Sequence, residues 1–374
     1  MFVEIHTIDD VLPHISYEDG IAVSPRVGYT VIDYVFVNNN TFSNAYAQEC
    51  RGLKFAPDGN ILARPFHKFF NIGEKQQPQD VDWTQPHVIM DKRDGSMVHP
   101  CIIAGELVFM TRMGVTDQAR LALSYADASL RAFCIATLQA GQTPIFEFTS
   151  PENRVILTYD QPEITLLAIR DTITGQYLPH DSLLELGEKF HVSVVNTFGQ
   201  IEDIGPFISQ ARALQGLEGY VIAFASGHRM KLKADAYVLR HKALAGVAYE
   251  KNLLEWIADG ALDDVLPILH DDVGERVKAY AATVLTSVRA HLDTIEALVE
   301  KIKGQDRKTC ALEIQAHLDK RLQGVAFAML DGRDGMEEMM KLIKRASHSE
   351  ARVEQYRDLF GMDWFGTDLV LKEN

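Results

Sequence analysis

The sequence predicts an α+β protein in which an antiparallel-sheet domain precedes an all-α carboxy-terminal domain. From Gly28 to about Phe224, short apolar or alternating runs are separated by turn residues, which is typical of antiparallel strands. After about Ala243 the apolar period changes from two to nearly 3.6, which indicates helices. We therefore place the two domains at residues 1–243 and 244–374.

Several short runs in the first domain are expected to be strands. They are residues 29–32, 35–37, 53–55, 107–109 and 164–167. Ala56-Pro57-Asp58-Gly59-Asn60 lies between two apolar runs and predicts a hairpin turn, because proline and glycine supply the required dihedrals. Helices are expected between strands, near residues 117–136 and 182–190.

One long amphipathic helix dominates the predicted second domain. Its stripe consists of Val277, Val284, Val288, Leu292, Ile295, Val299 and Ile302. Asp271 or Asp272 is available as its amino-terminal cap, and Gly304 as its stop. Further helices are expected at residues 308–330 and 335–345, with a break at 331–335.

The composition indicates a folded protein. With 374 residues, of which 47% are hydrophobic, the chain can build two cores. The amino terminus lacks a basic region followed by a long apolar run, and no segment approaches the ~20 apolar residues of a membrane span. We expect a monomeric cytoplasmic protein with no membrane partner. The four cysteines show no Cys-x-x-Cys pairing, so we expect them to be reduced and structural.

The formal net charge of −15 argues against extended binding of a nucleic-acid duplex, which depends on Lys and Arg. One local stretch is nevertheless basic. Between residues 229 and 242, five cations (Arg229, Lys231, Lys233, Arg240 and Lys242) face a single acid, Asp235. This stretch suits local phosphate handling, and the alternative is a solvated charged face.

The motif Lys92-Arg93-Asp94-Gly95 lies between the apolar runs Val88-Ile89-Met90 and Ser96-Met97-Val98. It therefore presents a lysine on a tight turn between two predicted strands, as a covalent nucleotide-accepting lysine requires. An ammonium group is no nucleophile, so its reference pKa of about 10.4 must be lowered by burial or by neighbouring cations. Alone the motif is weak, because surface Lys-x-Asp-Gly turns are common.

Strand alternation supplies charged neighbours for this turn. Lys231 and Lys233 share one face of their strand while Met230 and Leu232 take the other. Two cations on one face can hold a triphosphate, disfavour the charged form of Lys92 and neutralise a leaving pyrophosphate. The alternative is a solvated lysine ladder on an edge strand. Glu147 likewise points away from the apolar side of its own strand.

The order of motifs along the chain resembles that of the covalent nucleotidyltransferases, and specifically the RNA ligase 1 family of T-even-type phages. The motifs are Glu49-Cys50-Arg51-Gly52, Lys68-Phe69-Phe70-Asn71, the lysine turn, Glu147-Phe148, Leu217-Glu218-Gly219-Tyr220-Val221-Ile222, Arg229-Met230-Lys231-Leu232-Lys233 and, in the last third, Gly304-Gln305-Asp306-Arg307-Lys308-Thr309. The resemblance implies a nucleotidyltransferase (adenylyltransferase) domain over residues 1–243 and an all-helical RNA-recognition domain over 244–374.

The resemblance implies that Lys92 becomes covalently joined to AMP, with Gly95 in the same turn. Lys231 and Lys233 would contact the reacting phosphate. Arg51 and Lys68 would grip the outer phosphates of the nucleotide. Arg112 stands where the family carries a lysine, which keeps the charge and changes the geometry.

The resemblance also implies the nucleoside and metal contacts. Glu147 would bind the ribose and Phe70 would line the pocket. Tyr237 would stack on adenine, with Val221 on the opposite face. Core packing is the more frequent role of such a tyrosine. Glu218 would lie near the metal and the phosphate, because Mg²⁺ prefers carboxylate, water and phosphate oxygens. Asp263 and Asp264 would hold metal-bound water, and their alternative role is helix capping.

The implied function is an ATP-dependent RNA ligase that uses ATP and Mg²⁺, or Mn²⁺ in its place. It would join 5′-phosphate and 3′-hydroxyl RNA ends of tRNA or single-stranded RNA, in RNA repair, through a lysyl-AMP and an adenylylated RNA. The alternatives are an mRNA-capping guanylyltransferase, a DNA ligase, or a non-catalytic RNA-end-binding protein. The first two normally carry a strand-rich OB-fold domain after the lysine pair, whereas this chain becomes helical.

Overall fold

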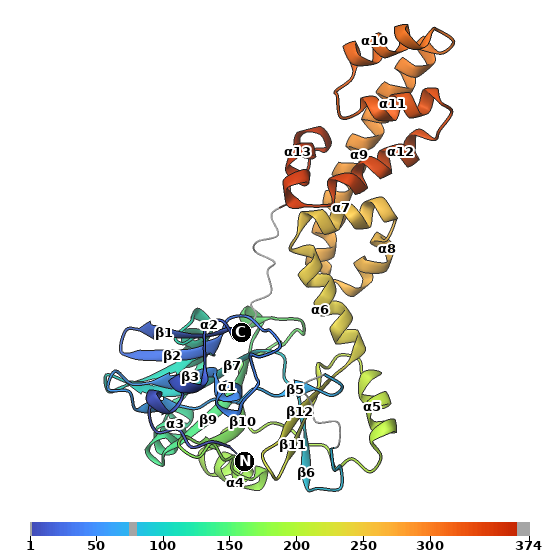
Figure 1. The fold of residues 1–374 in the computed structure, drawn as a ribbon. Coiled ribbons are helices and arrows are strands. Elements are labelled where there is room, and N and C mark those ends of the chain that lie inside the picture. Colours follow the sequence, from blue (N-terminus) through green and yellow to red (C-terminus); the bar gives the residue numbers. More distant parts are fainter. Residues whose placement is uncertain (1, 75–80, 365–374) are drawn as a thin grey trace. The chain divides into compact units, whose positions relative to one another are not determined.

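The computed structural model describes residues 2–74 and 81–364. It divides the chain into a first unit that ends at Val238 and a second unit that begins at Leu239. The boundary expected from the sequence, residue 243, and this division both fall within helix α6 (Asp235–Val247) (Figure 1). Residues 365–374, which the prediction assigned to the helical domain, lie outside the described residues.

Three four-stranded sheets build the described part of the first unit (Figure 1). Their strand orders are β1-β2-β3-β4, β10-β9-β7-β8 and β5-β12-β11-β6. The strands are β1 (Ile21–Arg26), β2 (Tyr29–Tyr34), β3 (Arg51–Phe55), β4 (Ile61–Ala63), β5 (Phe70–Asn71), β6 (His87–Asp91), β7 (Ser96–Ile103), β8 (Glu106–Met110), β9 (Gln142–Thr149), β10 (Glu163–Asp171), β11 (Gly219–Phe224) and β12 (Arg229–Lys233). Neighbouring strands run antiparallel except β12 and β5, which are parallel. The predicted fold class is confirmed.

The predicted hairpin turn joins β3 to β4. The amide of Ala56 donates to the carbonyl of Asn60 at 2.7 Å, and Gly59 takes a φ of +90°. The predicted strand over residues 35–37 is wrong. The β1–β2 ladder ends at the pair Ile21 and Tyr34, so the next three residues have no ladder partner, and their side chains are 44–53% exposed.

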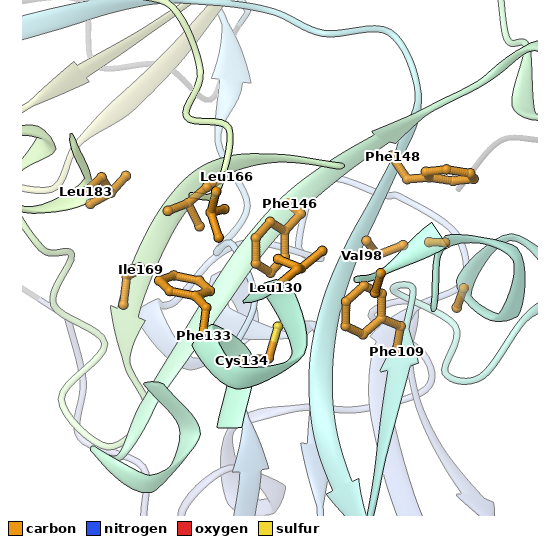
Figure 2. Close-up of a cluster of buried hydrophobic side chains, with 14 residues drawn as sticks. Val98, Phe109, Leu130, Phe133, Cys134, Phe146, Phe148, Leu166, Ile169 and Leu183 are labelled. Carbon is orange, nitrogen blue, oxygen red and sulfur yellow. The ribbon is translucent and has the colours of Figure 1, made fainter. Parts of the chain in front are cut away.

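One apolar cluster of the first unit packs helices against the sheet that contains β9 (Figure 2). Phe146 and Phe148 of β9 lie in it beside Phe133, as alternation predicts. The single helix expected over residues 117–136 is instead two helices, α2 (Asp117–Tyr125) and α3 (Ala128–Gln139). The break follows from Asp127, whose side chain caps α3 by accepting from the amide of Leu130 at 2.8 Å. The unit also contains α1 (Ala45–Glu49), α4 (His180–Phe190) and α5 (Ile204–Arg212).

The second unit is helical throughout its described part. Its longest helix is α9 (Asp271–Ile302), and all seven residues of the predicted stripe are buried. His270 occupies the amino-terminal cap position in place of the expected aspartate. The helix expected over residues 308–330 is broken into α10 (Arg307–His317) and α11 (Gln323–Leu330). The remaining helices are α7 (Glu250–Asp259), α8 (Leu262–Val265), α12 (Gly335–Ala346) and α13 (Glu350–Phe360).

Within the described ranges, no single helix has both the length and the apolar composition to cross a membrane. The bent pair α2 and α3 reaches that limit only when the two helices are counted together, across a bend of 115°. Residues of both helices belong to the buried cluster of the first unit. The expected cytoplasmic location stays a prediction.

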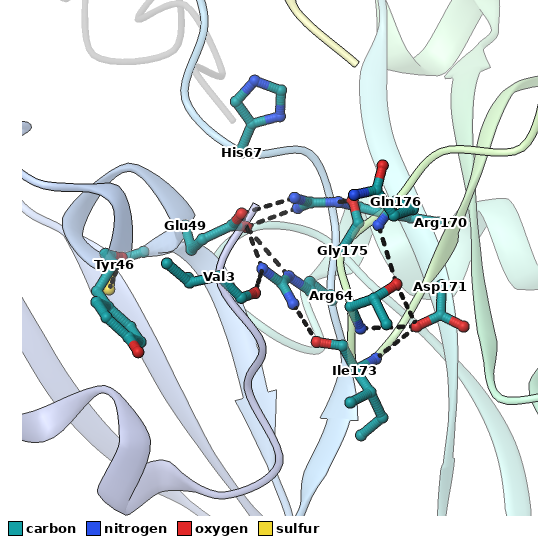
Figure 3. A network of polar contacts seen from close by, with 12 residues as sticks. Val3, Tyr46, Glu49, Arg64, His67, Arg170, Asp171, Ile173, Gly175 and Gln176 are labelled. Carbon is teal, nitrogen blue, oxygen red and sulfur yellow. Dashed lines mark hydrogen bonds and ion pairs between the residues drawn. The ribbon is translucent and has the colours of Figure 1, made fainter. Parts of the chain in front are cut away.

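A buried ion network holds the segment before β3 to the middle of the first unit (Figure 3). Glu49 is 3% exposed, and its carboxylate pairs with Arg64 at 2.9 Å and with Arg170 at 2.7 Å. Burial raises the pKa of Glu49, but the charges of Arg170 and Arg64 outweigh it and lower that pKa to about 2. The glutamate of the Glu-Cys-Arg-Gly motif is therefore a structural residue in this fold.

We predict that Glu49→Gln destabilises the protein by about 3–5 kcal/mol at neutral pH, because two buried guanidinium groups lose their charge partner. A depressed carboxyl pKa contributes stability that is present above the unfolded value of 4.5 and is lost as pH falls through about 2. The difference between wild type and variant in urea unfolding should therefore shrink over that range. Asp117→Asn, which alters only an exposed ion pair with Arg120, is the control. Equal effects of the two substitutions would contradict the prediction.

Candidate active site

Lys92 lies on the short connection between β6 and β7, as the sequence predicts. These two strands belong to different sheets, so the connection passes from one sheet to the other. The amide of Lys92 donates to the carbonyl of Gly219 at 3.0 Å, which extends the β6–β11 ladder to the lysine. The lysine is therefore fixed where β11 and β12 of one sheet face β9 of the other.

The aspartate and glycine of the motif hold this connection in place. Asp94 accepts hydrogen bonds from the amides of Ile156 and Leu157 at 2.8 and 2.6 Å, and from the hydroxyl of Tyr237 at 2.7 Å. A Cβ on Gly95 would lie 2.2 Å from the carbonyl oxygen of Phe148, so only glycine fits. These contacts explain why the lysine is followed by x-Asp-Gly.

A buried carboxylate bridges two of the predicted lysines. Glu218, which is 3% exposed, pairs with Lys92 at 2.7 Å and with Lys233 at 3.0 Å. Burial lowers the pKa of Lys92, but the charge of Glu218, with smaller contributions from Glu147 and Asp94, raises it above its usual value. The expected depression of the Lys92 pKa is therefore wrong, because the nearby carboxylates outweigh burial.

Lys231 is a lysine of this site whose pKa is lowered. Burial, followed by the charges of Arg51, Lys92, Lys68 and Lys233, lowers its pKa to about 7. Lys231 and Lys233 share one face of β12, while Met230 and Leu232 are buried in a core cluster on the other side, as predicted. The site thus holds a lysine whose charge a bound phosphate would restore.

Glu147 faces the site from β9, as alternation predicts. One carboxylate oxygen accepts from the amide of Gly95 at 3.0 Å. Burial raises its pKa to about 7, and the charge of Glu218 acts in the same direction, against the charge of Lys92. Near neutral pH this side chain can both donate and accept a hydrogen bond, which suits a sugar hydroxyl.

Two cavities open beside Lys92. The first, of about 160 Å³, is lined by Lys92, Lys231, Lys233, Arg51, Glu147, Val221, Met90, Leu167, Phe66, Phe69, Met97, Arg229, Asp91, Arg93 and Val195. The second, of about 510 Å³, is lined by Lys92, Gly95, Arg112, Glu147, Glu218, Tyr237, Arg51, Asp94, Met97, Val155, Tyr34, Val35, Phe36 and Val37. Lys92, Arg51, Glu147 and Met97 line both, so the lysine stands between them.

Val221 and Tyr237 do not line the same cavity. Val221 lies in the first, where Leu167 and Met90 are the other apolar walls, whereas Tyr237 lies in the second. Tyr237 is 5% exposed, and its hydroxyl is bonded to Asp94. The geometry therefore gives Tyr237 a positioning role on the lysine turn. Leu167 also lines the first cavity. The sequence analysis did not single it out, because it lies in an apolar run without a distinguishing residue.

Lys68 lies among aromatic rings. Its Nζ is 5.2 Å from the ring of Tyr34, 5.0 Å from that of Phe42 and 5.2 Å from that of Phe70. Burial lowers the pKa of Lys68. Phe70 lines neither of the two cavities beside Lys92, and its ring instead supports this lysine.

Arg112 stacks on Tyr34, an aromatic residue that the sequence analysis did not single out. Its guanidinium is 4.3 Å from the ring of Tyr34, and its Nε is 3.2 Å from a carboxylate oxygen of Asp33. That contact lacks hydrogen-bond geometry, since neither atom has a bonding partner among the described residues. Burial raises the pKa of Asp33 to about 6, against the charge of Arg112. Arg112 thus faces the second cavity with unused donor capacity.

Asp263 and Asp264 lie in the first turn of α8, in the second unit. Neither makes a side-chain cap of that helix. Across residues 2–74 and 81–364, no three His, Cys, Asp or Glu side chains are grouped as a metal site. The four cysteines are free and buried, as predicted.

Comparisons with known proteins agree with the motifs. A family model described as RNA ligase matches residues 49–242, and one described as the carboxy-terminal domain of T4 RNA ligase 1 matches residues 245–356. RNA ligase 1 of Bacteriophage TS2126 is 31% identical over an alignment of 209 residues, which covers 52% of this chain and 52% of the phage protein. The RNA ligase of Rhodothermus phage RM378 is 24% identical over an alignment of 379 residues, covering 81% and 85%.

Among solved structures, an archaeal ATP-dependent RNA ligase superposes with a TM-score of 0.47 at 18% identity. The match covers 62% of this chain and 63% of the archaeal chain, less than two thirds of the latter. Because the first family model alone spans more than half of the chain and the second continues it to residue 356, the chain belongs to the RNA ligase family, which confirms the family and the ligase class predicted from its motifs.

Proposed function

We propose that this protein is an ATP-dependent RNA ligase that joins a 5′-phosphate RNA end to a 3′-hydroxyl end. The observation that carries the proposal is the position of Lys92, held between two cavities and paired with a buried glutamate. The same glutamate also pairs with Lys233, and Lys231 faces the first cavity. Such a cluster suits transfer of a nucleotidyl group, which depends on positioning and charge stabilisation.

In the first step, the neutral amine of Lys92 attacks the α-phosphorus of ATP while the bond to the bridging oxygen of pyrophosphate breaks. Glu218 lies 2.7 Å from Nζ and is the nearest acceptor for the departing proton. Lys231 and Lys233 neutralise charge on the phosphate, and Arg51, with Lys68 and Arg112, binds the outer phosphates. A nucleoside in the first cavity would contact Val221 and Glu147.

In the second step, the AMP passes from Lys92 to the 5′-phosphate of RNA and leaves an adenylylated RNA end. In the third step, the 3′-hydroxyl attacks the RNA phosphorus and AMP departs, which forms the phosphodiester. Both steps move a phosphoryl centre past Lys231 and Lys233, so the same cations serve all three reactions. The second cavity, open beside Lys92, has room for the RNA end.

The donor set near Lys92 fits a divalent cation. Glu218 presents a buried carboxylate beside the place where phosphate oxygens would lie, and Mg²⁺ typically takes one or two carboxylates plus phosphate and water. Mn²⁺ accepts similar oxygen ligands. Bound there, the metal would withdraw charge from the phosphate and position it. Asp263 and Asp264 belong to the second unit, and their part in holding metal-bound water stays a prediction from the resemblance.

The proposed substrate is the end of a tRNA or another single-stranded RNA, in a repair role, with a monomeric enzyme. The helical unit is the proposed RNA-recognition element. Arg307, in the motif that begins at Gly304, forms an ion pair with Asp331 rather than being free, and Asp306 caps α10. RNA contact by Arg307 would therefore require that ion pair to open.

The alternatives within the same superfamily differ in the second unit. An mRNA-capping guanylyltransferase or a DNA ligase normally continues with a strand-rich OB-fold. From Leu239 to residue 364 the structure contains helices and no strand. A non-catalytic RNA-end-binding protein remains distinguishable by chemistry alone, because it would need no reactive lysine.

We predict that wild-type protein mixed with magnesium and ATP labelled at the α-phosphate acquires covalent label, and that Lys92→Ala acquires none. Lys189→Ala, which removes an exposed lysine of α4, is the matched control and should label like wild type. Incubation with pyrophosphate beforehand removes any AMP already attached, and intact mass confirms this.

The same experiment decides among the alternatives. Label from GTP in preference to ATP would favour a capping enzyme. Label on Lys92→Ala would show that another residue reacts. Folded wild type that takes no label after pyrophosphate treatment would contradict the ligase proposal and favour the RNA-end-binding protein.

We also predict that Glu218→Gln lowers the maximal rate of adenylylation and moves its pH dependence to lower pH. The carboxylate of Glu218 raises the pKa of Lys92, so wild-type reactivity increases as pH rises toward that raised value. Loss of an opposite charge at this range shifts a pKa by ~1–3 units, here downward. Single-turnover labelling across pH measures the shift. Glu163→Gln, which loses only the pairing with Arg93, should leave the profile in place, and an unmoved profile in Glu218→Gln would refute the role assigned to its charge.

A further inference from the structure

The sheet that carries Lys231 and Lys233 continues beyond the nucleotide cavity. On its strands the pairs Val221–Lys231 and Val221–Met90 form one row, which lines the first cavity. Two residues further along, the pairs Ala223–Arg229 and Ala223–Val88 form the next row on the same face. This row lines a third cavity, of about 420 Å³.

Arg229 has donor groups that the fold leaves unused. The residue is 5% exposed, and its Nε and Nη1 have no hydrogen-bond partner among the described residues. A hydrogen bond with Tyr177 and a ring contact at 4.1 Å account for another part of the guanidinium. No described carboxylate lies within ion-pair distance of it, which contrasts with Arg64 and Arg170, where Glu49 balances both charges. A buried guanidinium without a counter-ion is costly unless an anion joins it.

The amino-terminal end of α4 lines the same cavity. Pro179, His180, Asp181 and Leu183 line it. Helix α4 is 11 residues long and begins without a side-chain cap. The amide of Ser182 donates to the carbonyl of Pro179 at 3.1 Å, which leaves the amides of His180 and Asp181 for a ligand. Both ring nitrogens of His180 lack a described hydrogen-bond partner.

The other charged or titratable side chains of the cavity do not compete strongly for Arg229. His87 is already bonded at both ring nitrogens, to the carbonyl of Gln85 and the amide of Ile201. Asp181 is the one acidic residue in the lining, and its side chain is exposed. Its charge is therefore screened by water and opposes an anion only weakly.

We propose that this cavity is a second anion site, separate from the reacting phosphates, which binds a phosphate group through the Arg229 guanidinium, the amides at the start of α4 and the ring of His180. The ligand is either free phosphate or the phosphate of a small sugar phosphate, since a cavity of about 420 Å³ accommodates both. This cavity and the first cavity share three lining residues, Arg229, Met90 and Leu167. A ligand in one cavity therefore contacts residues that also line the other.

The test follows the ring of His180 by heteronuclear NMR in the full-length protein. The His180→Gln spectrum assigns its signal. Inorganic phosphate in one arm, and ribose 5-phosphate in the other, should shift that signal in a saturable way, and the arm with tighter binding identifies the ligand. Phosphate bound only at Lys92 would leave the His180 signal in place.

Two variants with opposite expected effects on phosphate affinity test the proposal. Arg229→Met should weaken binding at least about tenfold, because a charge-assisted contact is lost. Asp181→Asn should tighten it by a small factor, because a weakly opposing carboxylate is gone, and this exposed substitution remains informative if Arg229→Met fails to fold. Arg212→Met, an exposed arginine of α5, should bind like wild type. A His180 signal that does not move in wild type, or equal affinity in Arg229→Met, Asp181→Asn and wild type, would overturn the proposal. Labelling of Lys92, measured on the same samples, reports the ligase function separately.

Discussion

The buried carboxylate of Glu218 is the interaction around which the site is organised. It neutralises Lys92 and Lys233 at 2.7 and 3.0 Å in a place with little access to water. Without it, the two ammonium groups would repel each other beside Lys231, whose pKa is already lowered to about 7. A nucleotide phosphate brings the same sign of charge to the same lysines. Glu218 is therefore the counter-ion shared by Lys92 and Lys233, and in the proposed reaction a nucleotide phosphate would take part of this role.

The short connection between β6 and β7, which belong to two different sheets, places Lys92 beside Glu218. Lys92 must leave β6 at the level of Gly219, and β7 must begin against β9. Gly95 allows the close approach to Phe148, and Asp94 satisfies two amides and the Tyr237 hydroxyl on the far side. Each partner lies more than 50 positions away in the sequence, so the position of the lysine is set by tertiary structure rather than by a local turn.

Local periodicity was enough to predict the faces of β9 and β12 and the buried stripe of α9, and the proline and glycine of residues 56–60 were enough to predict the hairpin after β3. Features that depend on distant partners were not accessible in this way. Glu49 reads as part of a ligase motif, yet its role is to hold two arginines, of which Arg170 lies 121 positions away. The direction of the Lys92 pKa shift depends on the balance between burial and the nearby carboxylates, which only the folded structure brings together. The strand expected at residues 35–37 failed because pairing partners, and not apolar character, decide where a ladder ends.

Strand geometry also explains how a chain with a net charge of −15 concentrates cations around Lys92. Lys233, Lys231 and Arg229 occupy alternate positions of β12, so their attachment points are about 6.8 Å apart along one face. The first two lie beside carboxylates or other site residues that a nucleotide can replace, whereas Arg229 lies one row deeper, where water is largely excluded. A cation in a drier place gains more from an anion than one at the mouth of a cavity, because its charge is screened less. Arg229 is therefore the cation of β12 at which a bound anion would change the local charge balance most.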